Sequence, residues 1–408
     1  MTRRLYYEDP TLRAFEAAVT AVREREGGTE VALDATAFYP GGGGQPHDTG
    51  VLGGRRVLEA LEDGRVVWHR LDVPPGAPLA TGARVSAEVD WDRRFDLMQQ
   101  HTGQHILSRA FVDVARADTK SFHLGDAVVT IDVDHAGPGP ELLDRVEERA
   151  NEIVWEDRPV TTRWTTRAGA DALPLRKAPE VEGDVRIVEV ERFDWSACGG
   201  THVTRSGQVG LIHVLGTERY KQGTRVSFVC GKRALRRLRE AGSLLKALAL
   251  EFTSGEADLP RAVSRLKEER AALERRLKPL LRDVLDREAA ELVAGAARGA
   301  AGPVVASRFE GRDPAELGPL ASGIAARGGI ALLAAVPQGA EPARAHFAAP
   351  QGTIPVGTLL GALCRRHGGK GGGRAESAQG SFPADRVAQA LDDARAAAMA
   401  GPDSELFA

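Results

Sequence analysis

The segments QQHTGQHILSRAF (residues 99–111) and ACGGTHV (residues 197–203) decide the fold, because each places two metal-binding side chains four positions apart. The first segment has the spacing of a helix, and at i and i+4 the rings of His101 and His105 project from one face of it. In the second, two glycines between Cys198 and His202 let the backbone turn tightly around an ion. Three imidazoles and one thiolate are the tetrahedral ligand set of zinc, whereas calcium and magnesium prefer oxygen ligands. The sequence therefore predicts one Zn²⁺ ion held between the two segments.

The regions around these segments predict an α+β protein of several domains. Short runs of β-forming residues, broken by Gly and Pro, extend from Glu30 to Trp91 and predict a small antiparallel β-barrel over residues 1–91. Mixed helices and strands over residues 92–231 predict an α/β sandwich that contains the zinc. A leucine-rich, charged stretch over residues 232–300 predicts two long helices that form a hairpin or coiled coil, with a kink at Pro279. Its apolar stripe is suited to homodimer formation, although a solvated spacer is the alternative. Residues 301–408 predict a compact α/β module, which is a second candidate for the dimer contact.

Composition excludes several classes of protein. The chain has 408 residues, of which 42% are hydrophobic, and a net charge of -3, as in ordinary globular proteins with several cores. The three cysteines are an odd number spread over a long chain, which argues against a disulfide framework and favours a reducing cytoplasm. No window approaches eighteen uninterrupted apolar residues, so we expect neither a signal peptide nor a membrane span. Six further histidines stand singly and are expected to be hydrogen-bonded or on the surface. They are His47, His69, His135, His213, His346 and His367.

Longer segments around the paired motifs are FYPGGGGQPHDTG (38–50), HTGQHILSRAF (101–111), TKSFHLGDAVVTIDVD (119–134), CGGTHVTRSGQVGLI (198–212) and ERYKQGTRVSFVCGKRAL (218–235). In this order they resemble the AlaX family and the editing region of alanyl-tRNA synthetase. The run GGKGGGRAESAQGS (368–381) resembles the glycine-rich signature of the DHH-associated domain, so the chain is similar to the long form of AlaX. The class II aminoacylation core has no counterpart before the barrel. The resemblance therefore implies editing without charging: hydrolysis, in trans, of the ester on mischarged alanine tRNA.

The amino acid implied as the substrate is serine, and removal of glycine is left open. Polar side chains of the matched segments are the catalytic and pocket candidates, namely Thr36, Gln45, Thr102, Gln104 and His123. Such a pocket can hydrogen-bond the hydroxyl of serine, whereas alanine would leave its polar groups unpaired. Thr36 can equally satisfy local backbone groups. The glycine loop before Gln45 can be a hairpin turn or can let the backbone approach a substrate.

The function of the zinc has alternatives. Four protein ligands is the number of a structural site, while catalytic zinc usually keeps a position open. The ion can expand its coordination, one ligand can be weak, or the zinc can simply anchor the pocket. A metalloprotease is excluded, because the position of the glutamate in HExxH is Thr102. The alternative to an enzyme is a catalytically silent, zinc-stabilised tRNA-binding protein.

Basic residues concentrate where an RNA partner would bind. Between residues 219 and 239 the basic residues, with no acidic ones among them, are Arg219, Lys221, Arg225, Lys232, Arg233, Arg236, Arg237 and Arg239. A smaller basic set lies beside the late glycine run and consists of Arg365, Arg366, Lys370 and Arg374. Both sets are predicted to contact tRNA phosphates, although a solvated face is the alternative. The run HGGKGGG lacks the P-loop pattern, so tRNA binding and domain packing both remain open for it.

Overall fold

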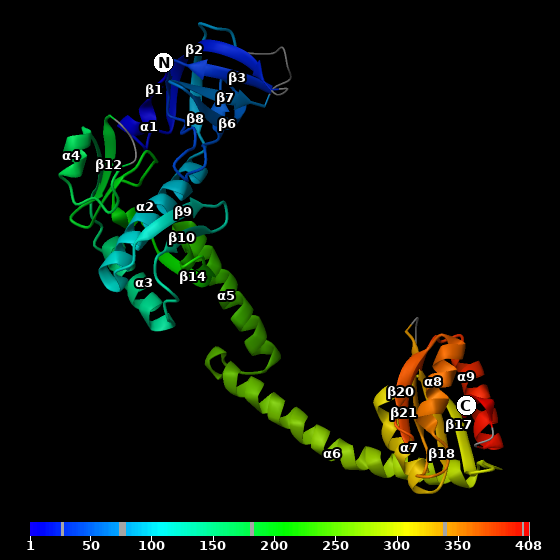
Figure 1. The fold of residues 1–408 in the computed structure, drawn as a ribbon. Helices are drawn as coiled ribbons and strands as arrows, with labels where there is room; N and C mark the ends of the chain where they lie inside the picture. The colour runs from blue at the N-terminus through cyan, green and yellow to red at the C-terminus, as the bar shows by residue number, and fades with distance from the viewer. Residues whose placement is uncertain (26–27, 73–78, 180–182, 338–340, 402–403, 408) are drawn as a thin grey trace. The chain divides into compact units, whose positions relative to one another are not determined.

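The computed structural model describes residues 1–25, 28–72, 79–179, 183–337, 341–401 and 404–407, and it confirms a mixed α+β chain. The chain divides into two compact units, Met1–Leu250 and Glu251–Ala408. Figure 1 labels the helices and many of the strands of both units. Within the described ranges, no helix combines the length and apolar character needed to cross a lipid bilayer.

The first unit begins with a closed barrel in which each pair of neighbouring strands is antiparallel. In pairing order its strands are β2 (Ala14–Arg25), β3 (Gly28–Leu33), β7 (Val66–Leu71), β6 (Arg55–Asp63), β5 (Gly50–Leu52) and β8 (Arg84–Val89). The sequence pattern predicted strands only from Glu30 onward and missed β2. Alternate side chains of β2, such as Ala17 and Val19, enter the barrel core, but their small size weakens the period-two signal.

A short N-terminal segment lies beside the barrel. It consists of β1 (Arg3–Arg4), which pairs in parallel with β4 (Ala35–Thr36), and the single-turn helix α1 (Leu5–Glu8). The ring of Tyr6 on α1 is buried and meets the ring of Tyr39 edge-on. The residues before the barrel strands therefore belong to this domain.

Helix α2 (Trp91–Ala115) follows the barrel and forms the centre of the next domain. It begins where the Asp90 side chain accepts a hydrogen bond from the Arg93 amide at 3.2 Å, and it ends at Arg116, whose φ of 54° is left-handed. Its buried face, with Met98 and Phe111, packs in one core with a helix and an antiparallel sheet of order β14-β15-β10-β9. These elements are α3 (Pro140–Trp155), β9 (Thr119–Leu124), β10 (Val129–Val133), β14 (Ile212–Tyr220) and β15 (Gly223–Cys230).

A smaller antiparallel sheet completes this domain and is followed by a long helix. The sheet has the order β11-β12-β13, and its elements are β11 (Val160–Thr165), α4 (Arg167–Asp171), β12 (Val185–Val190) and β13 (Asp194–Ala197). Helix α5 (Gly231–Glu251) then leaves the last strand of the larger sheet and exposes several leucines, among them Leu244 and Leu245. Pairing of this helix in a hairpin, and homodimer formation through it, stay predictions.

A fully buried ion pair fixes the barrel to α2. Arg94 of α2 and Asp48 of the loop before β5 are both inaccessible to solvent and are joined through two guanidinium nitrogens. The remaining guanidinium contacts are with the carbonyl oxygens of Ala37 at 2.5 Å and Pro10 at 3.0 Å. One charge therefore ties three separate stretches of the barrel domain to the helix.

The second unit is a three-layered α/β domain preceded by a long helix. Helix α6 (Leu259–Ala294) continues through Pro279. The sheet has the order β16-β17-β18-β19-β21-β20, in which only the pair β17 and β18 is parallel among the described pairings. Its elements are β16 (Ala297–Gly299), β17 (Gly302–Glu310), α7 (Leu317–Ala326), β18 (Ile330–Val336), β19 (Ala343–Ala348), α8 (Val356–His367), β20 (Lys370–Gly373), β21 (Ser377–Phe382) and α9 (Val387–Ala400).

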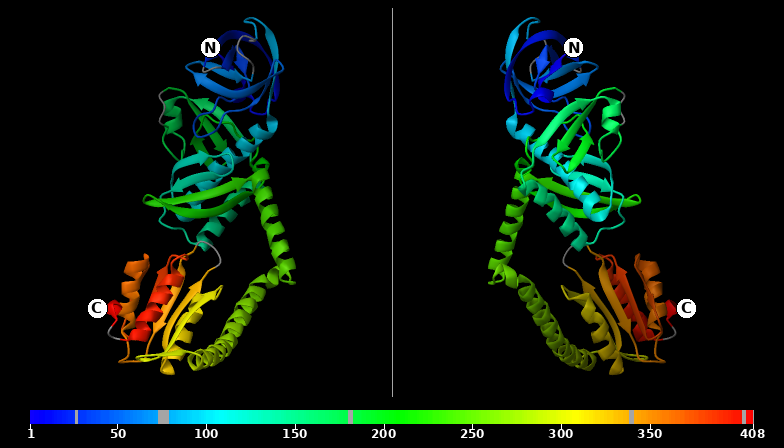
Figure 2. Two further views of the ribbon diagram at one scale, coloured as in Figure 1. Left: turned by 90° about the vertical axis from the view of Figure 1, so that its right-hand side faces the viewer. Right: turned by 90° about the vertical axis from the view of Figure 1, so that its left-hand side faces the viewer.

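Helices cover both faces of this sheet. One core contains α8 and α9, and the other contains α7 and the end of α6; Figure 2 shows the orange and red helices α8 and α9 together on one side. Every residue of β18 is consequently buried, as expected for its uninterrupted apolar sequence. The glycine run forms the hairpin of β20 and β21, where a Cβ at Gly373 would lie 2.3 Å from the Ser377 carbonyl oxygen. Close packing therefore explains glycine here.

Replacing Asp48 by Asn should destabilise the first unit by about 3–5 kcal/mol, because it leaves the Arg94 guanidinium buried without its counter-charge. All five tryptophans lie in this unit, so their fluorescence during urea denaturation reports on it alone. The matched control is Glu16→Gln, which breaks an exposed pair with Arg84 and should leave the midpoint almost unchanged. Equal shifts for the two variants would contradict a central role for the buried pair.

Candidate metal centre

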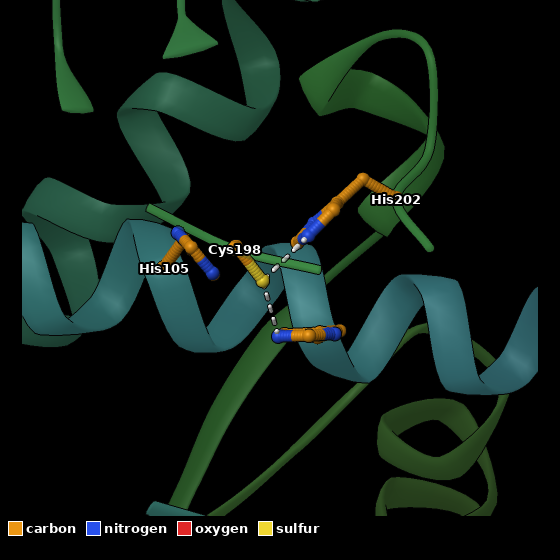
Figure 3. A group of neighbouring side chains, drawn as sticks. His105, Cys198 and His202 are labelled. Carbon is orange, nitrogen blue, oxygen red and sulfur yellow. Dashed lines mark hydrogen bonds between the residues drawn. The ribbon is translucent and has the colours of Figure 1, made fainter. Parts of the chain in front are cut away.

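The four predicted zinc ligands meet at one point of the first unit. Their ligand atoms, from His101, His105, Cys198 and His202, all lie within 4.8 Å of one another. The Cys198 Sγ atom is 3.3 Å from Nε2 of His101 and 3.3 Å from Nε2 of His202. Figure 3 shows the rings of His105 and His202 converging on the sulfur from two sides. The cluster therefore joins helix α2 to the turn that follows β13.

Each imidazole is held by a hydrogen bond at its outer nitrogen. Nδ1 of His101 lies 2.8 Å from Gln45 Oε1, Nδ1 of His105 lies 3.2 Å from Asp194 Oδ2, and Nδ1 of His202 lies 3.2 Å from Thr102 Oγ1. With a proton on Nδ1 in each ring, all three Nε2 lone pairs face the cluster. Such outer partners fix the tautomer and orientation of metal-binding histidines.

The charge states of the metal-free cluster follow from burial and from the contacts between its members. Burial, together with the neighbouring His101, lowers the pKa of His202 to about 3, so this ring is neutral. Burial opposes charge on His105 as well, but the hydrogen bonds and charges of Asp194 and Cys198 together outweigh burial and raise the pKa of His105 to about 9, so a metal ion would displace a proton from this ring. Burial also acts against a Cys198 thiolate, yet His101 and His202 hold the thiol pKa well below its ordinary value. The metal-free cluster thus favours a thiolate.

These residues fit Zn²⁺. Zinc binds imidazole nitrogen at about 2.0–2.1 Å and thiolate sulfur at about 2.3 Å, so ligand atoms on one tetrahedral ion lie roughly 3.5 Å apart. The observed sulfur–nitrogen distances of 3.3 Å are close to that value. The turn is also close to the rings: a Cβ at Gly200 would lie 2.2 Å from Cε1 of His101. Only glycine leaves room for the ring at that position.

The barrel reaches the cluster through its glycine loop. The four consecutive glycines from Gly41 to Gly44 all have positive φ, between 55° and 120°, a conformation that other residues rarely adopt. The loop then presents Gln45, whose Oε1 accepts from His101 and from the Thr201 amide while its Nε2 donates to Thr201 Oγ1 at 2.7 Å. One side chain therefore bridges both ligand segments.

A cavity of about 730 Å³ borders the cluster. His105 and Cys198 form part of its wall. The other walls come from the glycine loop, β9, β12 and the segment around Arg176. A metal ion at the cluster would therefore lie beside a space large enough for a small molecule.

The predicted pocket residues have different positions. Gln104 lines the cavity and is buried, whereas Gln45 and Thr102 lie behind the histidines and orient them. His123 is exposed on β9 and is not among the described residues that line the cavity. Thr36 lies within the barrel, where its hydroxyl is 2.8 Å from Nε2 of His69. Burial lowers the pKa of His69 to about 4, so its neutral ring accepts from Thr36, which has a structural role.

The predicted phosphate-binding residues fall into two groups, those held in ion pairs within the protein and those exposed to solvent. Arg233 is buried, forms an ion pair with Asp96 at 2.6 Å and donates to the Gly125 carbonyl, so it has no guanidinium exposed to a phosphate. Arg225 forms a bidentate pair with Asp132 on the neighbouring strand. The remaining residues of the two sets are exposed, namely Arg219, Lys221, Lys232, Arg236, Arg237, Arg239, Arg365, Arg366, Lys370 and Arg374.

Several residues of the site were missed from the sequence. Asp194 supports His105, and Ser108 binds the Gln104 side chain. A carboxylate shortly before a cysteine ligand is a usable signal for such support, because metal-binding histidines usually pair with one. Arg186 and Trp164 line the cavity as well. An arginine inside the apolar strand VRIVEV is itself a signal, since such positions are normally apolar.

Comparison with known proteins identifies the families that this chain resembles. Residues 185–227 match the family of the threonyl and alanyl tRNA synthetase second additional domain, and residues 301–400 match the DHHA1 domain family. The chain is 33% identical over 412 residues to the alanine–tRNA ligase of Methanoregula boonei, covering 97% of this chain and 43% of that ligase. It is 37% identical over 297 residues to the alanine–tRNA ligase of Pyrococcus abyssi, covering 68% of this chain and 32% of that ligase. It is 36% identical over 251 residues to the alanyl-tRNA editing protein AlaX-L of Pyrococcus horikoshii, covering 59% of this chain and 61% of that protein.

The chain therefore belongs to the proteins that combine a synthetase second additional domain with a DHHA1 domain. It is homologous to the editing region of alanyl-tRNA synthetase and to AlaX-L, which supports the predicted place in the long form of the AlaX family. The chain spans less than half the length of the two ligases.

Purified protein should contain about one zinc per chain, and Gln45→Leu should weaken zinc binding by about 10–100-fold, because His101 loses its outer hydrogen bond. Competition with a chromophoric chelator measures the affinity. Gln222→Leu, in the exposed turn between β14 and β15, is the matched control and should bind zinc like the wild type. An unchanged affinity in the Gln45 variant would show that this contact does not orient the ligand.

Proposed function

We propose that the chain hydrolyses the ester between serine and mischarged alanine tRNA, with Zn²⁺ held by His101, His105, Cys198 and His202. The observation that carries the proposal is the cavity of about 730 Å³ whose wall contains two of these ligands together with an unpaired, buried acceptor, Gln104 Oε1. The similarity to a protein named as an alanyl-tRNA editing protein supports an editing reaction.

Gln104 is suited to select the amino acid. Its Nε2 donates to Ser108 Oγ at 2.8 Å, and Ser108 also accepts from Thr119 Oγ1 at 2.7 Å, so the amide is fixed in one orientation. The side chain is 1% exposed, yet its Oε1 has no hydrogen-bond partner among the described residues. An unpaired buried acceptor costs about 1–3 kcal/mol, which a donor on the substrate would recover. The hydroxyl of serine is such a donor, and the methyl group of alanine is not.

In the proposed reaction, the metal ion and the side chains have different roles. When bound, zinc would supply a positive charge beside the cavity that polarises an ester oxygen or a water molecule. Gln45, Thr102 and Asp194 are positioning residues, because each holds one imidazole with Nε2 turned toward the cluster. Gln104 binds the amino acid, and the glycine loop brings backbone at Gly43 and Gly44 to the cavity wall. A catalytically silent zinc-stabilised protein remains the competing outcome, because four protein ligands also suit a structural site.

Single-turnover deacylation of seryl- and alanyl-tRNA(Ala) tests the proposal. The zinc-loaded protein should release serine and leave alanine largely bound, because only serine satisfies Gln104. Gln104→Leu should reduce the preference for serine roughly tenfold or more, since the buried acceptor is gone. Gln104→Glu keeps an acceptor oxygen and should retain more of the preference than the leucine variant.

Two outcomes would overturn the proposal. Comparable cleavage of both esters by the wild type contradicts selection through a hydroxyl. Binding of tRNA without any cleavage assigns the chain to the silent tRNA-binding class.

The exposed basic face is the proposed contact for the tRNA backbone. It consists of the exposed cations in and before α5, which are Arg219, Lys221, Lys232, Arg236, Arg237 and Arg239. Lys232 and Arg237 form exposed ion pairs with Asp92 and Glu240, which a phosphate can replace at little cost. Lys370 and Arg374 form a second proposed contact in the C-terminal unit, where both are exposed beside the glycine hairpin.

Replacing Arg236, Arg237 and Arg239 by Gln should weaken tRNA binding and flatten its salt dependence, since each lost phosphate contact removes roughly 0.9 from the log-log slope. Cleavage at saturating substrate should persist, because these residues lie outside the cavity lining. Filter binding at several salt concentrations measures the slope. Arg3, Arg84 and Arg145 are also exposed, and their triple replacement is the charge-matched control. Equal slopes for the two triple variants would rule out this face.

A further inference from the structure

Arg186 is a buried cation without a carboxylate partner. It lies on β12, is 5% exposed, and contributes to the wall of the cavity. Its Nη1 donates to the carbonyl oxygens of Cys198 at 2.9 Å and Gly200 at 2.8 Å. Its Nε and Nη2 atoms are buried and have no hydrogen-bond partner, and no described residue forms an ion pair with it. Two donors of a buried guanidinium are therefore unused.

Other buried or half-buried arginines of the same unit contrast with it. Arg94 pairs with Asp48, and Arg233 pairs with Asp96. Arg176, which also lines the cavity, pairs with Asp194 at 3.2 Å. Burying a charge is strongly unfavourable unless it is paired and hydrogen-bonded. The protein meets this requirement at the other three positions, so the exception at a cavity wall points to an anion that comes from outside the chain.

The neighbour of Arg186 on the next strand is an exposed aromatic ring. Trp164 of β11 is directly opposite Arg186 in the antiparallel register, so both side chains lie on one face of the sheet. The indole is 55% exposed and lines the same cavity. Tyr7 supports both residues: its ring is 4.9 Å from the Arg186 guanidinium carbon and meets the indole edge-on at 5.5 Å. The indole face of Trp164 thus lies beside the two unpaired N–H donors of Arg186.

The chemistry of an acylated RNA end identifies the anion. The carboxyl group of the amino acid is consumed in the ester, and the amino group is cationic, so the phosphodiesters are the anionic groups that remain. Arginine binds phosphate oxygens through two parallel N–H donors, and aromatic rings stack on nucleobases. A nucleotide unit carries both groups.

We propose that Arg186 and Trp164 form a subsite for one nucleotide of the RNA 3′ end, in which Arg186 donates Nε–H and Nη2–H to the phosphate and Trp164 stacks on a base. The assignment of the ligand to an RNA end rests on the proposed function. Arg186 is a substrate-binding residue in this arrangement, and it also holds the turn that carries Cys198.

Calorimetric titration of the full-length, zinc-loaded protein with adenosine 5′-monophosphate and with adenosine tests the subsite without requiring deacylation. The wild type should bind the monophosphate at least roughly tenfold more tightly, because the phosphate gains charge-assisted hydrogen bonds. Arg186→Gln should reduce this ratio toward one. Trp164→Ala should weaken both ligands roughly tenfold and keep the ratio, because stacking is common to both.

The matched control is Arg163→Gln, which changes an exposed arginine next to Trp164 in sequence that faces Glu189 at 3.6 Å. It should keep the wild-type ratio. Zinc content and the thermal transition are measured for every variant. If Arg186→Gln loses zinc, the test depends on the wild type and on Trp164→Ala. Equal affinity of the wild type for adenosine 5′-monophosphate and adenosine overturns the subsite.

The results separate this inference from the proposed reaction. Serine release together with equal binding of both ligands overturns the subsite and leaves the hydrolase. A monophosphate preference that depends on Arg186, without any serine release, does the reverse. A preference that persists in Arg186→Gln, with cleavage at saturation strongly reduced, assigns Arg186 to the reacting ester and overturns the phosphate contact.

Discussion

The ion pair between Arg94 and Asp48 is the contact on which the site depends, because it joins the loop of the barrel to the helix that carries two of the ligands. The pair lies away from solvent, and the same guanidinium also donates hydrogen bonds to the carbonyl oxygens of Ala37 and Pro10. A charge in such surroundings is tolerated only when its partners are in place, so other positions of the loop are strongly disfavoured. Gln45, three residues before Asp48, is thereby held against His101.

The supports of the cluster come from different directions, and so do the polar groups of the cavity. A barrel side chain, a neighbour on α2 and a carboxylate of β13 each fix one imidazole. Two of the residues that line the cavity have buried, unpaired polar atoms: Gln104 on α2 has an acceptor, and Arg186 on β12 has two donors. An acceptor suits the amino acid and a donor suits the nucleotide. In the proposed complex, groups of opposite polarity would therefore contact the amino acid and the nucleotide of the acylated RNA end.

Much of the site could be predicted from local spacing, and the rest could not. His101 and His105 share a helix face, and Cys198 and His202 share a turn, so four-residue intervals contain the information. Pairings such as Asp48 with Arg94 join positions far apart in the chain and leave no local pattern. Arg233 belongs to a basic run that predicts contacts with phosphates, but in the structure it pairs with Asp96. The barrel strand β2 was missed because small residues gave its alternation little contrast.

The side chain of Gln45 finds its hydrogen-bond partner Thr201 across a separation of 156 residues. During synthesis at roughly 5–20 residues per second, the loop is therefore complete about 8–30 s before its partner leaves the ribosome. The barrel strands can close in that interval, since they pair among themselves and end at Val89. The glycine loop cannot reach its final hydrogen bonds until the turn after β13 has emerged. A nascent chain can thus pass through a period in which the barrel is folded before its loop and the first two histidines meet the other residues of the cluster.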